Sequence, residues 1–442
     1  MLIKRITLQN FKNFERLEID LNNINIIVGA NASGKSNFIQ SIRFLRDIQK
    51  YGIENAISLQ GGFEYLQNIQ LKGQENTLIS VDFQPQGATI VGKTPFNTLI
   101  LSHYKTINYT IEISSKKNNK YEIANEELTI TTELKELDET IAKQKNLNKE
   151  EFFKNTFFLI NQTFSLKNSK GKFKLLPQSK ENSIKLILKN QQEYSLDLNE
   201  IRMFPLPFSL LNGNNQLQKT IIEQFPLPLF DLSDIGIYEF DLKNSKKPAL
   251  ITAKAELEEN GENLAIVIKN ILENKEQTRK FSNLLTDILP FIKELDVEKS
   301  YDKSLLYKVK EKYNPNTFIP SSLLSDGTVS IASILTALFF ENKKLAIFEE
   351  PEQGVHPSLI AKLMQLFYDA STEKQIIITT HNPEIIKHTK IEDLLLISRN
   401  DTGFVSLIKP SENEMVKSFL ENELGIDQLN AKEIQIKNRF SN

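Results

Sequence analysis

The feature that most constrains this fold is the run from Gly29 to Ser36. It reads G-A-N-A-S-G-K-S and fits the phosphate-loop pattern G-x-x-x-x-G-K-[ST]. Residues 24–28 predict a strand that leads into the run, and residues 37–48 predict a helix that leads out of it. In that setting, consecutive backbone N–H groups and the start of the helix face the phosphates of a nucleotide. The alternative is a glycine-rich turn that binds nothing, but the flanking elements favour a nucleotide site.

The residues of the loop have different predicted roles. Lys35 is expected to reach the outer phosphates, and the Ser36 hydroxyl is expected to bind Mg²⁺. Gly29 and Gly34 are expected to let the backbone turn tightly. The residues expected to contact the nucleotide here are Asn31, Ala32, Ser33, Gly34, Lys35, Ser36 and Asn37.

Composition excludes several kinds of site. The chain has 442 residues, no cysteine and four histidines, which excludes disulfide or thiolate chemistry and disfavours a structural zinc site. The formal net charge of −2 gives no support for nucleic-acid binding, although a local basic face stays open. We recognise no signal peptide and no apolar run long enough to span a bilayer, so we expect a cytoplasmic protein without membrane contacts.

A second cluster lies at residues 324–328, which read L-S-D-G-T and precede a helix pattern over residues 329–340. Ser325 is a good residue to open a helix, and Gly327 allows close approach of another backbone. A hydroxyl and free N–H groups at the start of a helix can bind an anion. Taken alone, the cluster favours an ordinary capped helix.

Two further clusters follow short apolar runs that predict buried strands. Residues 345–348 are followed by Glu349 and Glu350, and residues 375–379 are followed soon after by His381. The first acid is expected to orient Mg²⁺, and the second to position the attacking water. The histidine is expected to contact the γ-phosphate. Solvated glutamates and a structural histidine are the alternatives, and each cluster gains weight from the others.

The rest of the chain indicates an α/β organisation. Strand patterns cover residues 3–8, 14–21 and 78–83, and a crossover helix is predicted over residues 357–370. The segments on either side of residues 84–322 are expected to be halves of one sheet. Strands are also expected at residues 109–114 and 121–132, a helical region at residues 261–291, and a polar, helical tail at residues 412–442. Residues 133–155 have helical composition and predict a lever of about 35 Å.

Together and in this order, the four clusters resemble the ABC-type ATPase heads of the RecF and SMC branch. The N-F-K-N-F run at residues 10–14 resembles the opening of that branch. The E-x-P-E-x-x-x-H-P form at residues 349–357 resembles its predicted-ATPase subfamily, which includes the ATPase parts of overcoming-lysogenization-defect nucleases and of bacterial anti-phage systems. The resemblance covers residues 1–83 and 320–400, and it extends to the G-E-N-L run at residues 261–264. Residues 84–250 match nothing recognised.

The resemblance implies a fold and a division of the chain. The fold is an α/β ABC-type ATPase head, with a mixed sheet around the phosphate-loop helix and an inserted α+β region with a short helical lever. Residues 1–83 and 321–400 would be the two parts of the head. Residues 84–320 would be the insertion, and residues 401–442 a C-terminal extension.

The resemblance also implies a composite ATP site between two copies. Lys35 and Ser36 of one copy would hold ATP and Mg²⁺, while Ser325 and Gly327 of another would close over the γ-phosphate. Lys12, the basic residue of the N-terminal motif, would contact the nucleotide. The residues expected to act in hydrolysis are Glu350, His381 and Lys35, and those expected at the metal are Ser36 and Glu349.

Two departures from the family pattern bear on that site. Glu349 stands where the family usually has Asp, and one more methylene puts direct Mg²⁺ geometry in question. The glutamine that contacts the metal in such heads is either Gln67 or Gln74 or another residue.

The leading functional prediction is an ATPase that forms a homodimer or higher oligomer through its heads. It would be the sensor or engine of an anti-phage or DNA-maintenance system, with a separate nuclease or toxin as effector. The alternatives are a stand-alone DNA-binding repair or clamp ATPase, and a scaffold that binds ATP with little hydrolysis. Lysines at residues 116–117 and 167–174 could touch DNA phosphates, but the net charge favours solvated loop lysines. A membrane transporter does not suit the insert or the N-terminal motif.

Overall fold

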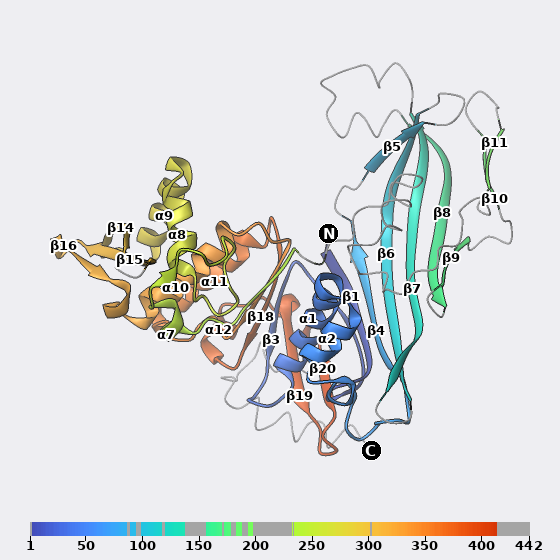
Figure 1. Cartoon of the computed structure of the whole chain (residues 1–442), viewed down its shortest axis with the longest axis horizontal. Coiled ribbons are helices and arrows are strands. Elements are labelled where there is room, and N and C mark those ends of the chain that lie inside the picture. Colours follow the sequence, from blue (N-terminus) through green and yellow to red (C-terminus); the bar gives the residue numbers. More distant parts are fainter. Residues whose placement is uncertain are drawn as a thin grey trace. The chain divides into compact units, whose positions relative to one another are not determined.

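The computed structural model divides the chain into two compact units, which are described one at a time (Figure 1). The first unit is Met1–Asp20 with Ser41–Ser233, and the second is Leu21–Gln40 with Asp234–Asn442. The described residues are 2–85, 89–93, 99–116, 120–137, 156–169, 172–177, 183–187, 193–197, 232, 234–300 and 303–412.

The second unit is built on a six-stranded mixed sheet. Its strand order is β12 (Ile235–Tyr238), β17 (Leu345–Glu349), β18 (Gln375–Thr380), β3 (Ile24–Val28), β19 (Leu394–Arg399) and β20 (Val405–Ile408). Neighbouring strands from β12 to β19 pair in parallel, and β20 closes the sheet as an antiparallel edge. Every residue of β3 and β18 is buried, which suits strands covered on both faces. The predicted strands at residues 24–28, 345–348 and 375–379 are confirmed.

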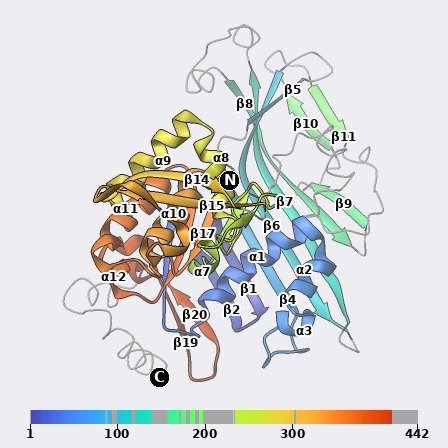
Figure 2. The same cartoon turned by 60° about the vertical axis from the view of Figure 1, so that its left-hand side comes forward.

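Helices of the second unit share a hydrophobic core with this sheet and pack on one another (Figure 2). They are α7 (Leu242–Ser245), α8 (Leu264–Leu272), α9 (Lys275–Ile288), α10 (Asp326–Phe339), α11 (Ile360–Ala370) and α12 (Pro383–Lys387), with short 3₁₀ turns at Ser321–Leu323, Pro357–Leu359, Ile391–Asp393 and Pro410–Glu412. Helix α11 is the predicted crossover between β17 and β18. In the shared core, the ring of Phe348 on β17 lies 5.1 Å from that of Phe367 on α11.

A small antiparallel sheet completes the second unit. Its strands are β13 (Ala249–Leu250), β14 (Ile292–Lys299), β15 (Ser304–Glu311) and β16 (Asn314–Pro320), with β15 in the middle. Alternate residues of β15 face the core, among them Tyr307 and Val309. On the other face, Lys308 and Lys310 lie over the ring of Phe318 and pair with acids of β14.

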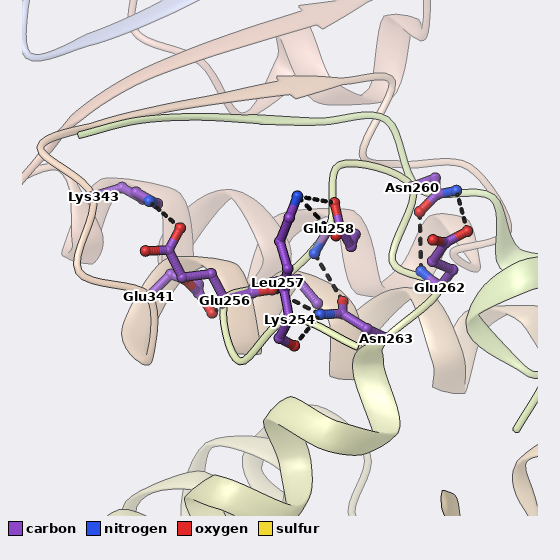
Figure 3. A network of polar contacts seen from close by, with 9 residues as sticks. All are labelled: Lys254, Glu256, Leu257, Glu258, Asn260, Glu262, Asn263, Glu341 and Lys343. Carbon is purple, nitrogen blue, oxygen red and sulfur yellow. Dashed lines mark hydrogen bonds and ion pairs between the residues drawn. The ribbon is translucent and has the colours of Figure 1, made fainter. Parts of the chain in front are cut away.

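The G-E-N-L run at residues 261–264 fixes the loop that precedes α8 (Figure 3). The Asn263 amide donates to the carbonyls of Lys254 (2.8 Å) and Glu256 (2.7 Å) and accepts from the N–H of Glu258 (2.8 Å). Glu341, just beyond α10, accepts from the N–H of Leu257 at 2.9 Å. Because Asn263 is buried and bonded three times, this run has a structural role within the unit.

The first unit is dominated by an eight-stranded antiparallel sheet. Its order is β2 (Phe14–Asp20), β1 (Leu2–Phe11), β4 (Thr77–Gln84), β6 (Leu99–Ser115), β7 (Tyr121–Leu137), β8 (Thr156–Ser169) and β9 (Lys172–Pro177), with β5 (Thr89–Lys93) also paired to β6. Figure 2 shows the long strands β6, β7 and β8 running together. A two-stranded sheet, β10 (Ser183–Ile187) with β11 (Glu193–Asp197), and helices α2 (Ile53–Leu59) and α3 (Phe63–Leu66) also belong to this unit. Helix α1 (Lys35–Tyr51) begins in the second unit and ends in the first.

The α/β class and the mixed sheet are confirmed, and two details of the prediction are wrong. Of the N-terminal strands, β3 joins the sheet of β17 and β18, whereas β1, β2 and β4 belong to the other sheet. Residues 133–137 lie in β7, paired with both β6 and β8, so no helical lever begins at Glu133. Residues 138–155, and the predicted helical tail beyond residue 412, lie outside the described residues.

The helical region predicted at residues 261–291 is confirmed as α8 and α9. The division at residues 83, 320 and 400 stays a prediction, and the two compact units group the chain differently. Over the residues that the structure describes, no helix is long and apolar enough to cross a membrane.

Candidate nucleotide site

The candidate site lies where three neighbouring parallel strands end. Glu349 at the end of β17 pairs in register with Thr379 of β18, and Thr380 of β18 pairs with Val28 of β3. The chain leaves β3 into the phosphate loop at Gly29, whose N–H donates to the Thr380 carbonyl at 3.3 Å. The carboxyl edge of a parallel sheet is where such folds bind ligands. The register therefore brings the loop, both acids and His381 to one edge of one unit.

The phosphate loop has the geometry that its glycines require. A Cβ at Gly29 would lie 2.4 Å from the Ile397 carbonyl oxygen, so a side chain there would clash with β19. Gly34 has φ +113°, a region that favours glycine, and Ala32 also has positive φ (+62°). Asn31, Ala32 and Ser36 are exposed and Asn37 is half-buried, whereas Ser33, Gly34 and Lys35 are buried.

Lys35 folds back onto its own loop. Its ammonium donates to the carbonyls of Gly29 (2.7 Å) and Ala30 (3.0 Å). Burial lowers the pKa of Lys35, and the nearby charges of Glu350, Glu352 and Glu349 act in the opposite direction. The cation therefore lies among three carboxyl groups, held by neutral acceptors of the loop.

Ser36 and Glu349 are in direct contact. The Ser36 hydroxyl donates to Glu349 Oε2 at 3.0 Å, although 313 residues separate the two in sequence. A serine hydroxyl and a carboxylate side by side are ligands that Mg²⁺ accepts together with phosphate oxygens and water. The longer glutamate, in place of the aspartate usual in the resembled heads, spans the distance to the hydroxyl. This donor pair fits the predicted metal position.

Glu350 and His381 form the second contact of the site. Nδ1 of His381 lies 2.8 Å from Glu350 Oε1, and both side chains are partly exposed, at 49% and 36%. Glu350 has φ +45°, an unusual conformation for a glutamate, and its N–H donates to the Thr379 carbonyl at 2.9 Å. A carboxylate paired with an imidazole at a solvent-accessible edge can accept a proton from water.

Glu352 is a member of the site that residue types alone did not identify. It is 7% exposed, Oε1 is hydrogen-bonded to the Thr380 hydroxyl, and burial raises the pKa of its carboxyl group. The E-x-P-E pattern contains Glu352, but nothing in that pattern indicates burial.

Ser325 caps α10, as the ordinary interpretation of its cluster predicts. Its Oγ accepts from the N–H of Thr328 at 3.2 Å. A Cβ at Gly327 would lie 3.0 Å from the Gly354 carbonyl oxygen, so the turn after β17 closely approaches the start of α10. Any contact of Ser325 or Gly327 with nucleotide in a second copy stays a prediction.

Lys12, Gln67 and Gln74 lie in the first unit, and their roles at the nucleotide stay predictions. Lys12 has φ +50°, and burial lowers the pKa of its ammonium. The amide of Gln67 is buried, and neither of its polar atoms has a hydrogen-bond partner within the described part of the chain. Lys116 pairs with Glu122, which reduces its availability to phosphates.

Comparison with known proteins finds a family model that matches most of the chain. The sequence profile of a family described as "AAA domain, putative AbiEii toxin, Type IV TA system" matches residues 24–387. Endonuclease GajA of Bacillus cereus (strain VD045) is 26% identical over 406 residues, which are 87% of this chain and 56% of that protein. The chain thus spans about half the length of this relative.

Shorter and more distant similarities were also found. The DNA replication and repair protein RecF of Lactococcus lactis subsp. lactis (strain IL1403) is 48% identical over 46 residues, 10% of this chain and 13% of that protein. A crystal structure of an Smc head bound to the C-winged-helix domain of ScpA covers 92% of this chain and 98% of its own, at 13% identity and a TM-score of 0.44.

Proposed function

The chain belongs to the AAA-domain family whose description is "AAA domain, putative AbiEii toxin, Type IV TA system", and from that premise we propose that it binds and hydrolyses ATP. The reaction converts ATP and water to ADP and phosphate. One observation carries the proposal: the phosphate loop, Glu349, Glu350 and His381 meet at one edge of one sheet.

Binding would begin at the phosphate loop. The backbone N–H groups of the loop and the start of α1 would receive the phosphates, and Lys35 would exchange the carbonyls of Gly29 and Ala30 for phosphate oxygens. Ser36 and Glu349 would hold Mg²⁺, which when bound neutralises phosphate charge. Lys35, Ser36 and Glu349 already lie at the same edge of the sheet, so binding would exchange their present hydrogen bonds for contacts with phosphate and metal.

Hydrolysis would depend on the Glu350–His381 pair. Glu350 positions a water molecule and accepts its proton as the water oxygen attacks the γ-phosphorus. His381 orients Glu350 and donates to a γ-phosphate oxygen. Ser325 and Gly327 of a second copy would close the site, so that ATP favours a dimer of heads and hydrolysis releases it.

The cellular role that we propose is the engine or sensor of a bacterial defence or DNA-maintenance system, with a nuclease or toxin as a separate effector, in the cytoplasm. The similarity to the endonuclease GajA over about half of that protein supports this role. The short match to RecF favours a second candidate, a DNA-binding repair or clamp ATPase. A scaffold that binds ATP with little hydrolysis is the third.

Two variants test the proposed reaction. We expect Lys35→Ala to abolish ATP binding in calorimetry. Glu350→Gln should bind ATP as the wild type does, hydrolyse it at least about a hundredfold more slowly and accumulate as a dimer in mass measurements with ATP. Lys269→Ala removes an exposed lysine that pairs with Glu273 on α8 and serves as the control. Wild-type turnover by Glu350→Gln would refute the proposed role of Glu350 in hydrolysis. Unchanged ATP affinity of Lys35→Ala would refute the proposed nucleotide site.

A further inference from the structure

A buried carboxyl group of the candidate site has no part in the proposed mechanism. Glu352 is 7% exposed, and its Oε2 has no hydrogen-bond partner among the described residues. Oε1 is hydrogen-bonded to the hydroxyl of Thr380, which is fully buried at the end of β18. Burying a carboxyl group is unfavourable unless its contacts compensate, so the contact with Thr380 needs an explanation.

The direction of that hydrogen bond follows from its neighbour. The backbone N–H of Asn382 donates to the Thr380 hydroxyl oxygen at 2.9 Å. The hydroxyl hydrogen is therefore available for Glu352 Oε1, which accepts it whether or not the carboxyl group is protonated. Asn382 in turn caps α12, because its Oδ1 accepts from the N–H of Glu384 at 2.9 Å. One hydroxyl thus joins the buried acid to the chain on the far side of His381.

The same two loops also meet at the Glu350–His381 contact. His381 lies between Thr380 and Asn382, and Glu350 lies two residues before Glu352 in one turn, closed by the N–H of Gln353 on the Glu350 carbonyl at 3.0 Å. The outer contact, between Glu350 and His381, is about half exposed, and exposed pairs hold side chains weakly. The inner contact, between Glu352 and Thr380, is shielded from water, where hydrogen bonds are stronger.

We propose that Glu352 is a positioning residue: through the Thr380 hydroxyl it holds the backbone on both sides of His381, and so sets the imidazole against Glu350. The consequence for turnover rests on the proposed ATPase function. Glu352 acts through a hydrogen bond and its negative charge is not required. Removing the link leaves the phosphate loop intact, so it reduces the rate of hydrolysis and leaves ATP binding unchanged.

Substitutions at Thr380 separate the hydrogen bond from the shape of the side chain. Thr380→Val keeps the shape and loses the hydroxyl, and we expect kcat to fall about tenfold with ATP affinity unchanged. Thr380→Ser keeps the hydroxyl and should stay within about twofold of the wild type. The matched control is Thr336→Val, which also removes a buried hydroxyl, bonded at 2.8 Å to the Ala332 carbonyl inside α10. It should leave kcat unchanged.

Substitutions at Glu352 test whether its charge matters. Glu352→Gln keeps an oxygen that accepts from Thr380 and should retain activity within about threefold. Glu352→Ala should lower kcat by no more than Thr380→Val does, because Thr380→Val also removes the acceptor of the Asn382 N–H. A tenfold loss in Glu352→Gln with the Thr380 contact intact would overturn the proposal, because it would assign the role to the charge.

A double-variant cycle tests whether the link acts through His381. In a His381→Ala background, adding Thr380→Val should change kcat by less than about twofold, because the ring that it positions is absent. A further tenfold loss would mean that Thr380 acts elsewhere, and would overturn the proposal.

A measurement without turnover keeps the proposal separate from the ATPase reaction. The chain has four histidines, so the ring signals of ¹⁵N-histidine-labelled protein are few, and His381→Ala identifies the one of interest. That signal should move in Thr380→Val and stay in Thr380→Ser and Thr336→Val. A signal that stays in Thr380→Val overturns the positioning role. Absent wild-type hydrolysis together with a moving signal overturns the proposed function alone.

Discussion

The contact between Ser36 and Glu349 predicts what shortening the acid would do. Glu349→Asp removes one methylene, about 1.5 Å of reach. The 3.0 Å contact between Ser36 Oγ and the carboxylate would therefore open to about 4.5 Å, beyond a hydrogen bond. The backbone of β17 cannot follow, because Glu349 is in register with Thr379 between two buried strands. Losing a hydrogen bond to a charged group costs about 1.5–3 kcal/mol, or roughly 10- to 150-fold in an equilibrium constant.

The assay is a Mg²⁺ titration of phosphate release at saturating ATP. We expect the half-saturating Mg²⁺ concentration of Glu349→Asp to rise by about tenfold or more, with kcat at saturating Mg²⁺ within about threefold of the wild type. ATP binding measured by calorimetry in EDTA should be unchanged, because Lys35 and the loop N–H groups are untouched. Glu349→Gln keeps the length and the contact with Ser36 but loses the charge, so it separates reach from charge.

The reasoning fails if Glu349→Asp has the Mg²⁺ dependence of the wild type. The glutamate would then have no metal role that depends on its length, and the contact with Ser36 would only stabilise the loop. Glu273→Asp, an exposed acid that pairs with Lys269 on α8, is the control for a glutamate shortened away from the site.

Three other predictions follow from the second unit. Ser325→Arg should stop phosphate release while calorimetry still detects ATP binding, and full activity would leave Ser325 as a helix cap alone. Burial raises the pKa of Glu341, so the unfolded chain releases this proton at a lower pH than the folded protein does. As pH rises from about 4.5, the wild type should therefore lose stability relative to Glu341→Gln, measured as urea midpoints at pH 5 and 8. A wild type that gains stability relative to the variant over this range would contradict the reasoning. Gly354→Ala should lower the free energy of unfolding by about 1–2 kcal/mol in urea titration, because φ is +76°. The new methyl would also lie 2.7 Å from Leu242 Cδ1, so that side chain would have to shift. An unchanged midpoint would show that the turn relaxes.

The sequence predicted the strands that end at the candidate nucleotide site, because the apolar runs that indicate them do not depend on residues elsewhere in the chain. An uninterrupted apolar run such as residues 345–348 indicates burial on both faces wherever the strand lies. The sequence did not predict which strands belong to the same sheet. Strand β1 alternates between buried and less buried residues, which suits an antiparallel sheet with one covered face, and β1 joins such a sheet and not that of β3.

The predicted helix at residues 133–155 is wrong over residues 133–137, the part of this range that the structure describes. Residues 133–137 read E-L-K-E-L and favour a helix by propensity. In the protein they pair with β6 on one side and β8 on the other. Pairing on both sides outweighs the small helix preference of a few residues, and no local pattern reveals it.

The residues of the candidate site also differ in how far the sequence alone could predict their positions. Lys35, Ser36 and Gly34 were predictable because one contiguous motif contains them. Ser36 meets Glu349 only because β3 and β17 both flank β18, an arrangement that emerges from the strand order. The role of Glu352 depends on burial, and a glutamate is ordinarily a surface residue.

The short turn after β17 combines backbone strain at Glu350 with hydrogen bonds that hold the turn in place. Glu350 has φ +45°, which costs about 1–2 kcal/mol for a residue with a side chain. The turn is held by the Gln353 N–H on the Glu350 carbonyl (3.0 Å), the Val355 N–H on the Glu352 carbonyl (2.9 Å) and the buried bond of Glu352 to Thr380.

These bonds offset the strain and keep the Glu350 carboxylate at the edge of the sheet, where the proposed reaction needs it. The same turn brings the Gly354 carbonyl to Gly327 at the start of α10. The turn that contains Glu350 therefore also packs against the segment that contains Ser325.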